Sequence, residues 1–301
     1  MLTRSMVGKI CMVSGATSGF GAVTARALAR LGATVIVLGR DRKKCARQVE
    51  KIRRETGSRV EGMVADLASQ REIRRLAEEF RSKFPRLDVL VNNAASYFMR
   101  RELTEDGLER AFALNHLAPF LLTSLLLDRL EASPSARVVN LSSNAHTVGK
   151  IDFEDLQCER RYDRLSAYSR SKLASLLFTY ELARRLKGSR LTVNAVNPGS
   201  AATNLGSDNG WLRGWLRVKL RNLFKGYLIS AEEGAKSSIY LATSPELEGV
   251  TGRYFLHCKE VPSSVASYDQ ATADRLWRVS EELTGVRPAA SAVHSCPSLP
   301  C

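Results

Sequence analysis

The stretch AYSRSKLA, residues 167–174, places Tyr168 four residues before Lys172 at the start of an amphipathic pattern. Residues four apart share one face of a helix, so the phenol and the ammonium would lie together. A tyrosine hydroxyl has an ordinary pKa of about 10, and a neighbouring cation brings that pKa toward neutrality. The pair therefore predicts an acid–base unit. Because this spacing also arises by chance, the elements around the pair must decide whether it does chemistry.

Short apolar runs alternate with longer amphipathic segments along the chain. The runs that we interpret as strands are 9–14, 34–39, 59–65, 88–94, 136–142 and 190–196. The segments that we interpret as helices are 22–31, 42–56, 71–80, 107–131 and 163–187. Strands that are apolar on both faces and separated by helices are typical of parallel sheets covered on both sides. The pattern predicts an α/β fold, a Rossmann-type doubly wound parallel sheet flanked by helices on both faces.

The boundaries of this unit also follow from composition. No repeat or linker divides residues 1–285, so we expect one domain there, with its dinucleotide-binding half at the N-terminal side. Residues 286–301 are rich in Ala, Ser and Pro without periodicity, which predicts a disordered tail.

The net charge and the cysteine content restrict the partners and the cellular compartment that we expect. A net charge of +14 favours anionic partners such as phosphate-bearing cofactors, acidic membrane surfaces or nucleic acid. No nucleic-acid-binding module accompanies the charge, so we expect no nucleic acid. The six cysteines have no metal-ligand spacing, so we expect no metal and reduced thiols. Without a signal peptide or a long apolar run, the sequence predicts a cytoplasmic protein.

The segment SGATSGFG, residues 14–21, lies between the first strand and the first helix. Its glycines, Gly15, Gly19 and Gly21, let the backbone turn sharply and approach a pyrophosphate, while the helix start supplies free N–H groups. A glycine-rich turn alone is weak evidence. Its place on the first strand–helix turn of a doubly wound pattern predicts dinucleotide binding.

The ends of the second and third strands bear on the cofactor. After the second strand, LGRDRKK places Arg40 where a ribose 2′-phosphate would be held, with Arg42 to Lys44 behind it. A guanidinium matches a phosphate in charge and geometry, so we favour NADP(H) over NAD. Asp41 is the alternative, since its carboxylate would accept a 2′-hydroxyl, and Arg42 to Lys44 are alternatively a solvated helix start. Asp66 would accept from the adenine amino group or cap the next helix, where Ser69 suits better.

The joint pattern resembles the short-chain dehydrogenase/reductase superfamily over residues 7–285. The motifs that carry the resemblance are SGATSGFG, DLAS (66–69), NNAA (92–95), LNHL (114–117), VVNLSS (138–143), YSRSK (168–172) and NPG (197–199). Within the superfamily the chain looks most like the retinol dehydrogenase group, through APFLLTSLLLDRL (118–130), ARVVNLSSNAH (136–146) and SKLASLLFTYELARRL (171–186). Members of that group oxidise or reduce hydrophobic alcohols and carbonyls.

The resemblance implies a role for four residues. Tyr168 would be the general acid in carbonyl reduction and the base in alcohol oxidation, with its pKa lowered by Lys172, which would also bind the nicotinamide ribose. Ser143 would hydrogen-bond the substrate oxygen, and Asn115 would position a water that links Lys172 to solvent. The implied cofactor-binding residues are Gly15, Thr17, Ser18, Gly19, Phe20, Gly21, Arg40, Asp66, Leu67, Asn92, Ala94, Tyr168, Lys172, Pro198, Gly199 and Thr203.

Departures from the family pattern leave alternatives. Phe20 stands where the family usually has Ile and would narrow the cofactor entrance, and Ala95 replaces the last Gly of NNAG. Neither change removes a polar group, so we expect activity rather than a silent nucleotide-binding or membrane-surface scaffold. VNNAASYF also resembles protochlorophyllide reductases, but Ala174 stands where those have a cysteine. His116 and His146 are interpreted as packing or substrate-lining residues.

The substrate side is expected near 200–230. Residues 211–226, WLRGWLRVKLRNLFKG, place tryptophans and leucines on one side of a helix and basic residues on the other. Such a helix would be a lid over a small hydrophobic substrate, a peripheral membrane contact, or both. The resemblance also implies a homodimer in which the helices 107–131 and 163–187 pair across a two-fold axis.

Overall fold

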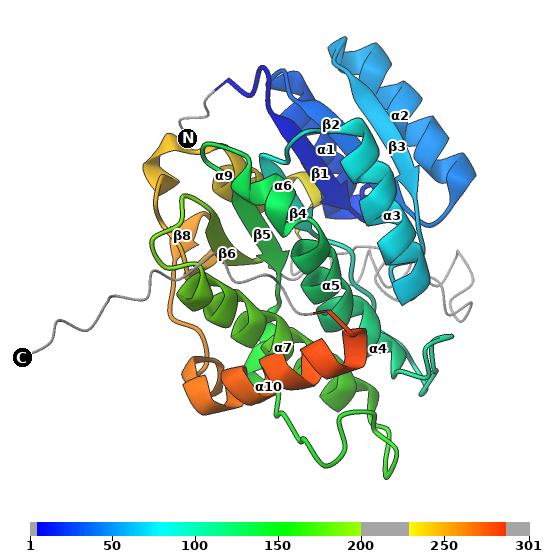
Figure 1. The fold of residues 1–301 in the computed structure, drawn as a ribbon, viewed down its shortest axis with the longest axis vertical. Coiled ribbons are helices and arrows are strands. Elements are labelled where there is room, and N and C mark those ends of the chain that lie inside the picture. The colour runs from blue at the N-terminus through cyan, green and yellow to red at the C-terminus, as the bar shows by residue number, and fades with distance from the viewer. Residues whose placement is uncertain (1–4, 200–228, 287–301) are drawn as a thin grey trace, which may run out of the picture.

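The computed structural model describes residues 5–199 and 229–286. Their strands form one sheet in the order β3-β2-β1-β4-β5-β6-β7-β8 (Figure 1). Every neighbouring pair from β3 to β7 is parallel, and only β7 and β8 pair antiparallel. The order reverses between β1 and β4, which is the switch point of a doubly wound sheet. The predicted fold class is confirmed.

The six predicted strands are present, with small changes at their ends. The strands are β1 (Ile10–Ser14), β2 (Thr34–Gly39), β3 (Val60–Val64), β4 (Val89–Asn92), β5 (Arg137–Leu141), β6 (Thr192–Asn197), β7 (Tyr254–Leu256) and β8 (Lys259–Glu260). The sequence did not reveal β7 and β8, because runs this short have no period of their own. It also extended β4 as far as Ala94, whereas the strand ends at Asn92.

The helices follow the predicted pattern except in one region. They are α1 (Gly19–Arg30), α2 (Arg42–Thr56), α3 (Gln70–Lys83), α4 (Arg110–Phe112), α5 (Ala118–Leu125), α6 (Leu127–Glu131), α7 (Arg164–Arg185), α9 (Ala231–Thr243) and α10 (Gln270–Thr284). The predicted helical region 107–131 is present from Arg110 to Glu131, but the π-helix η1 (Ala113–Leu117) and a break at Leu126 divide it into α4, α5 and α6. Short 3₁₀ turns are η2 (Asn144–Val148), η4 (Pro245–Leu247) and η5 (Val265–Tyr268).

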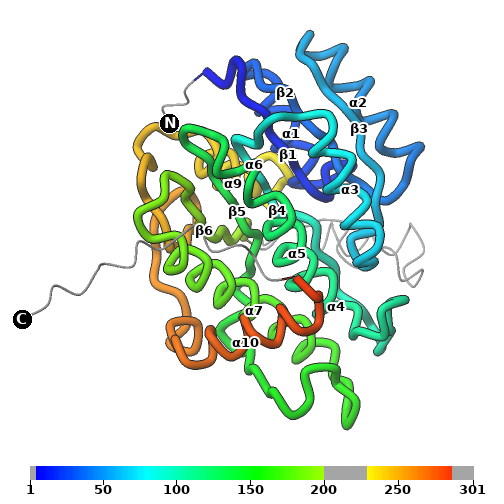
Figure 2. Tube along the Cα trace, viewed as in Figure 1, coloured from blue at the N-terminus to red at the C-terminus, as the bar shows by residue number. Residues whose placement is uncertain are grey.

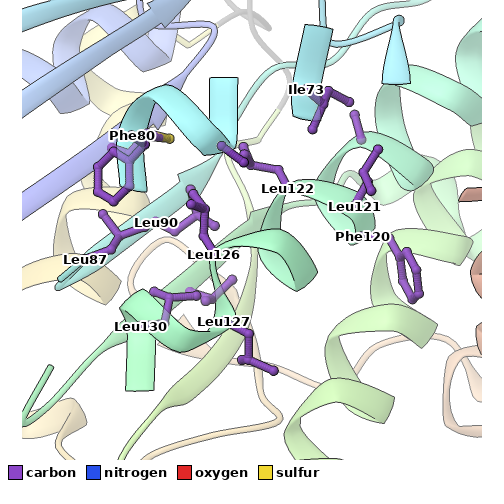
Figure 3. Close-up of a cluster of buried hydrophobic side chains, with 14 of the residues drawn as sticks. Ile73, Phe80, Leu87, Leu90, Phe120, Leu121, Leu122, Leu126, Leu127 and Leu130 are labelled. Carbon is purple, nitrogen blue, oxygen red and sulfur yellow. The ribbon is translucent and has the colours of Figure 1, made fainter. Parts of the chain in front are cut away.

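The sheet is buried on both faces. Alternate residues of β1 enter different clusters, with Met12 in the one beneath α3, α5 and α6 and with Cys11 and Val13 in the one beneath α1, α2 and α9. Figure 3 shows the first cluster, where Phe80 and Leu90 lie near Leu126. Burial on both faces explains the continuous apolar runs in the sequence.

Helix α10 packs across α5 and α7 (Figure 2). The Trp277 ring meets the Phe120 ring edge-on at a centroid distance of 5.0 Å and lies at 26° to the Phe178 ring at 6.0 Å. The Arg185 guanidinium covers the indole at 4.3 Å. The expected homodimer would pair these same helices, α5 and α7. Because α10 covers part of each, a second copy could contact only the part that α10 leaves uncovered.

The contacts of Trp277 predict a large loss of stability on truncation. Trp277→Ala removes a side chain that is only 4% exposed, and we expect the free energy of unfolding to fall by about 3–5 kcal/mol in urea denaturation. Val265→Ala, at a side chain that is 89% exposed, is the control and should change it by less than about 0.5 kcal/mol. A Trp277→Ala loss as small as the control's would show that α10 is not part of the cooperative core.

Candidate active site

One cavity runs along the carboxyl ends of six strands. It has a volume of about 710 Å³, and its lining comes from the ends of β1 to β6 and the segments after them, together with side chains of α2, η1 and α7. Predicted site residues that line it are Gly15, Thr17, Ser18, Gly19, Phe20, Arg40, Asp66, Leu67, Ala94, Ser143, Tyr168, Lys172, Pro198 and Gly199. Parallel strands bring their carboxyl ends to one edge, which is where open α/β sheets bind ligands.

The loop after β1 is built for close approach of a ligand. Gly15 and Gly19 have φ values of 64° and 56°, in the left-handed region that favours glycine. A Cβ at Gly21 would lie 2.4 Å from Asn93 Nδ2 and 2.5 Å from the Gly15 carbonyl oxygen, so no side chain fits there. Gly21 therefore packs the loop rather than lining the cavity. The loop, followed by α1, offers the backbone cradle that a pyrophosphate requires.

Asn93 fixes this loop, and the sequence did not single it out. Its Nδ2 donates to the Ser14 carbonyl at 2.8 Å, and its backbone N–H donates to Ser14 Oγ at 2.9 Å. Asn92, which was expected to line the cofactor, does not line the cavity. It is buried and donates to Asn140 Oδ1 at 2.8 Å and Thr123 Oγ1 at 3.2 Å, because as the last residue of β4 it faces the helix layer.

Basic side chains gather where β2 ends. Arg40, Lys44 and Arg47 all line the cavity there. Asp41 also borders it, but its Oδ1 caps α2 by accepting the Lys44 N–H at 2.9 Å, and this bond lowers the pKa of Asp41. Arg47 was missed by sequence reasoning, although its position three residues after Lys44 places it on the same face of α2.

Asp66 and Ser69 divide their roles as the sequence suggested. Ser69 caps α3 by accepting the Glu72 N–H at 3.2 Å, which leaves Asp66 at the cavity. Asp66 Oδ1 accepts the Ala68 N–H at 2.9 Å, and this holds the carboxylate at the end of β3.

Tyr168 and Ser143 meet at the far end of the cavity. Ser143 begins η2, and its Oγ accepts the Ala145 N–H at 3.2 Å. Burial raises the pKa of Tyr168, and a hydrogen bond with Ser143 partly offsets this. The ring of Tyr97 meets the Tyr168 ring edge-on at 5.4 Å, so the phenol lies between an aromatic wall and a hydroxyl. The phenol therefore carries its proton at neutral pH. The expected lowering of its pKa by Lys172 is not found in the structure, where burial has the larger effect.

Lys172 is almost completely buried beside this pair. Its side chain is 1% exposed, and its Nζ donates to the Leu141 carbonyl at 3.0 Å and lies 5.6 Å from the centre of the Tyr168 ring. Burial lowers the pKa of Lys172 to about 7. At neutral pH the amine is therefore poised between its two forms, which suits a group that helps to move a proton.

Asn115 lies next to this group without lining the cavity. It sits in the π-helix η1, where its Oδ1 accepts the Ser96 N–H and its Nδ2 donates to the Ser96 carbonyl, each at 2.9 Å. Its Nδ2 also contacts Ser171 Oγ at 2.9 Å, which ties the loop after β4 to α7. The water-positioning role stays a prediction.

Phe20 lies at the cavity, whereas His116 lies away from it. Phe20 lines the cavity but also packs on α9, where a Cβ at Gly234 would lie 2.0 Å from its ring. His116 is buried and contacts Ser280 Oγ at 2.9 Å, away from the cavity lining, as a packing residue. Thr203, the segment 211–226 and the tail beyond residue 286 lie outside the described residues.

Within residues 5–199 and 229–286, no cluster of three or more His, Cys, Asp or Glu side chains could hold a metal ion. No helix among the described elements has the length and apolar character needed to cross a bilayer. The described cysteines, Cys11, Cys45, Cys158 and Cys258, are all free thiols.

The model of the family called short chain dehydrogenase matches residues 9–210. The chain belongs to this family. It is 42% identical to retinol dehydrogenase 14 of Mus musculus, covering 93% of this chain and 87% of that one. It is also 42% identical to polyprenol dehydrogenase of Homo sapiens, covering 92% and 86%. The chain is thus a dehydrogenase related to retinol dehydrogenases, an oxidoreductase that acts on CH–OH groups.

Solved structures agree with this assignment. An uncharacterized protein from Mycobacterium paratuberculosis is 36% identical with a TM-score of 0.76, over 95% of this chain and 97% of that chain. An NADP active-site complex of RhlG from Pseudomonas aeruginosa is 27% identical with a TM-score of 0.67, over 85% and 97%. The family uses NAD(P), and the cavity of this dehydrogenase fits a dinucleotide, with a glycine cradle between the basic end and Tyr168.

The buried amine predicts a pH-dependent effect on stability. Between pH 7 and 10.5 the Lys172 amine binds fewer protons in the folded chain than in the unfolded chain, so the wild type gains stability as pH rises. Lys172→Met removes this dependence. We expect the variant to be more stable at pH 7, with an advantage that shrinks by about 1.4 kcal/mol per pH unit above pH 7.

Urea denaturation at several pH values measures this difference. Lys51→Met, at an exposed lysine of α2, is the control for the change of side chain. A Lys172→Met difference that does not vary with pH would contradict a depressed pKa for Lys172.

Proposed function

We propose that the protein is an NADP(H)-dependent oxidoreductase that interconverts a hydrophobic alcohol and its aldehyde or ketone. The observation that carries the proposal is one continuous cavity with a cationic end at Arg40, Lys44 and Arg47 and a proton-transfer end at Tyr168 and Ser143. When bound, the nicotinamide supplies the hydride. The chain must then hold the cofactor and the substrate and move one proton.

Tyr168 moves that proton. In carbonyl reduction its hydroxyl donates to the substrate oxygen, and in alcohol oxidation the phenolate accepts the proton. Burial keeps the phenol protonated at neutral pH, which is the form that a general acid needs. Ser143 Oγ donates a hydrogen bond to the substrate oxygen, and the Lys172 cation stabilises the phenolate that remains.

The cationic end selects the cofactor. Three basic side chains at the end of β2 can neutralise a ribose 2′-phosphate, whereas Asp41, the carboxylate that would favour NAD, is engaged as the cap of α2. Guanidinium groups bind phosphate through paired N–H donors, so Arg40 and Arg47 give this end its preference for NADP.

The hydrophobic nature of the substrate rests on the surroundings of Tyr168. The ring of Tyr97 packs against Tyr168, and the exposed Met99 and Leu165 lie close by in the chain. Met99 Sδ contacts the guanidinium of Arg164 at 3.6 Å, which joins the segment after Tyr97 to the start of α7. The names of the relatives, retinol and polyprenol dehydrogenase, agree with a lipid-like alcohol or carbonyl.

Tyr168→Phe tests the mechanism. Loss of the acidic hydroxyl should lower kcat for NADPH-dependent reduction of apolar aldehydes by at least about 100-fold. NADPH binding, followed by its fluorescence, should remain. Tyr240→Phe removes a hydroxyl that donates to Glu246 on the other face of the sheet and should keep wild-type kcat. Equal rates for Tyr168→Phe and wild type would refute the mechanism.

Removal of the basic side chains tests the choice of cofactor. Arg40→Ala and Arg47→Ala should each lower kcat/KM for NADPH about tenfold, because each loses a charge-assisted contact with the 2′-phosphate. The value for NADH should change little. Lys51→Ala, on the same helix and outside the cavity lining, is the matched control. Equal losses with both cofactors would exclude a 2′-phosphate site here.

A further inference from the structure

His146 occupies the turn that carries Ser143, and the proposed mechanism does not use it. Its side chain is 2% exposed, and its ring meets the Tyr254 ring of β7 edge-on at 5.1 Å. The Nδ1 atom lies 2.6 Å from the Ser143 carbonyl oxygen, and the Nε2 atom lies 3.1 Å from the backbone nitrogen of Ser264. The imidazole therefore bridges the serine turn and a segment far away in sequence.

The two partners determine which nitrogen carries the proton. A backbone N–H can only donate, so Nε2 of His146 must be the unprotonated acceptor of the Ser264 N–H. The proton of the neutral ring then sits on Nδ1 and is donated to the Ser143 carbonyl. The backbone N–H of His146 donates to the same carbonyl at 3.1 Å. The Ser143 peptide is thus held by two donors from one residue.

The Ser264 side of the bridge leads back to the helix that bears the tyrosine. Ser263 Oγ contacts the hydroxyl of Tyr180, on α7, at 2.7 Å. The Tyr180 and Tyr268 rings stack at 5.3 Å with their planes 6° apart. The bridge therefore connects the Ser143 turn, through residues 263–264, to the same rigid helix as Tyr168.

We propose that His146 is a positioning residue that fixes the Ser143 hydroxyl relative to the Tyr168 hydroxyl. The inference rests on the proposed function, because it assumes that Ser143 and Tyr168 share the substrate oxygen. Ser143 caps the short 3₁₀ turn η2, so its peptide lies outside the regular hydrogen bonds of a long helix or strand. Two described side-chain bonds join the serine pair to α7 directly: that of Ser143 with Tyr168, and that of Ser142 Oγ with the Lys172 carbonyl, at 3.2 Å. His146 adds to these by holding the backbone of Ser143. A displacement of about 1 Å at a reacting group lowers rates by up to about 100-fold.

Three substitutions at His146 test the role. His146→Ala removes both bonds and should lower kcat about tenfold, with KM and Kd for NADPH unchanged. His146→Asn places an amide donor near the Nδ1 position and should recover part of kcat, whereas His146→Gln, whose amide reaches the Nε2 position, should not. If His146 contributed only to stability, kcat of the variants would follow their melting temperatures, measured in the same samples. It would not depend on whether the new side chain keeps a donor near the Nδ1 position.

Tyr180→Phe tests the second half of the bridge. It keeps the ring stacking but loses the bond to Ser263, so it should lower kcat in the same way. The His146→Ala/Tyr180→Phe double variant should lose less than the product of the two single effects, because both interrupt one bridge. Thr147→Ala is the matched control, since this exposed neighbour bonds only within the turn, to the Asn144 carbonyl at 2.9 Å.

The outcomes separate this inference from the proposed function. If Tyr168→Phe loses activity while His146→Ala keeps wild-type kcat, His146 has no positioning role. The inference also fails if kcat and NADPH affinity fall together, or if the donor-keeping Asn variant is no better than Gln. Wild-type kcat for Tyr168→Phe would instead remove the proposed function itself.

Discussion

The burial of one amine is the constraint on which the site depends. A lysine that is 1% exposed destabilises the folded chain at neutral pH, because removing an ammonium from water is costly. Lys172 Nζ donates to the Leu141 carbonyl at the end of β5 and lies over the ring of Tyr168. The amine thus links the end of a central strand to α7. The fold tolerates this arrangement, and the result is an amine whose pKa of about 7 matches proton transfer at neutral pH.

The parallel sheet brings the residues of the site together at one edge. The residues after β1, β4 and β5 supply the glycine loop, Asn93 and Ser143, and these elements lie side by side at the switch point. The glycine loop, Asn93 and Ser143 directly follow strands, so the sheet sets their positions, whereas Tyr168 and Lys172 are positioned by α7. Polar contacts such as those of Asn93 with Ser14 and Asn115 with Ser96 then join neighbouring loops.

Helix α10 covers part of the outer surface of α5 and α7. Trp277 of α10 fills the space beside Phe120 and Phe178, so helices that resemble a subunit interface in sequence are partly covered from within the chain. On the other side of α7, Tyr180 and Tyr268 stack beneath the segment that reaches His146. Packing around α7 therefore covers part of its outer surface and, in the role that we propose for His146, also positions the Ser143 turn.

The sequence by itself determined the fold class and most of the residues that line the cavity. These features are local patterns: the apolar runs of the strands, the glycines of residues 14–21 and the Tyr168–Lys172 spacing. A local pattern can be recognised in the sequence without knowing which distant residues are in contact. The tertiary structure alone decided that Asn92 is buried away from the cavity, that Asp41 is a helix cap and that Arg47 joins Arg40. It also decided the depressed pKa of Lys172 and the bridge through His146. These depend on burial and on partners distant in sequence, such as Ser264, which no periodicity can reveal.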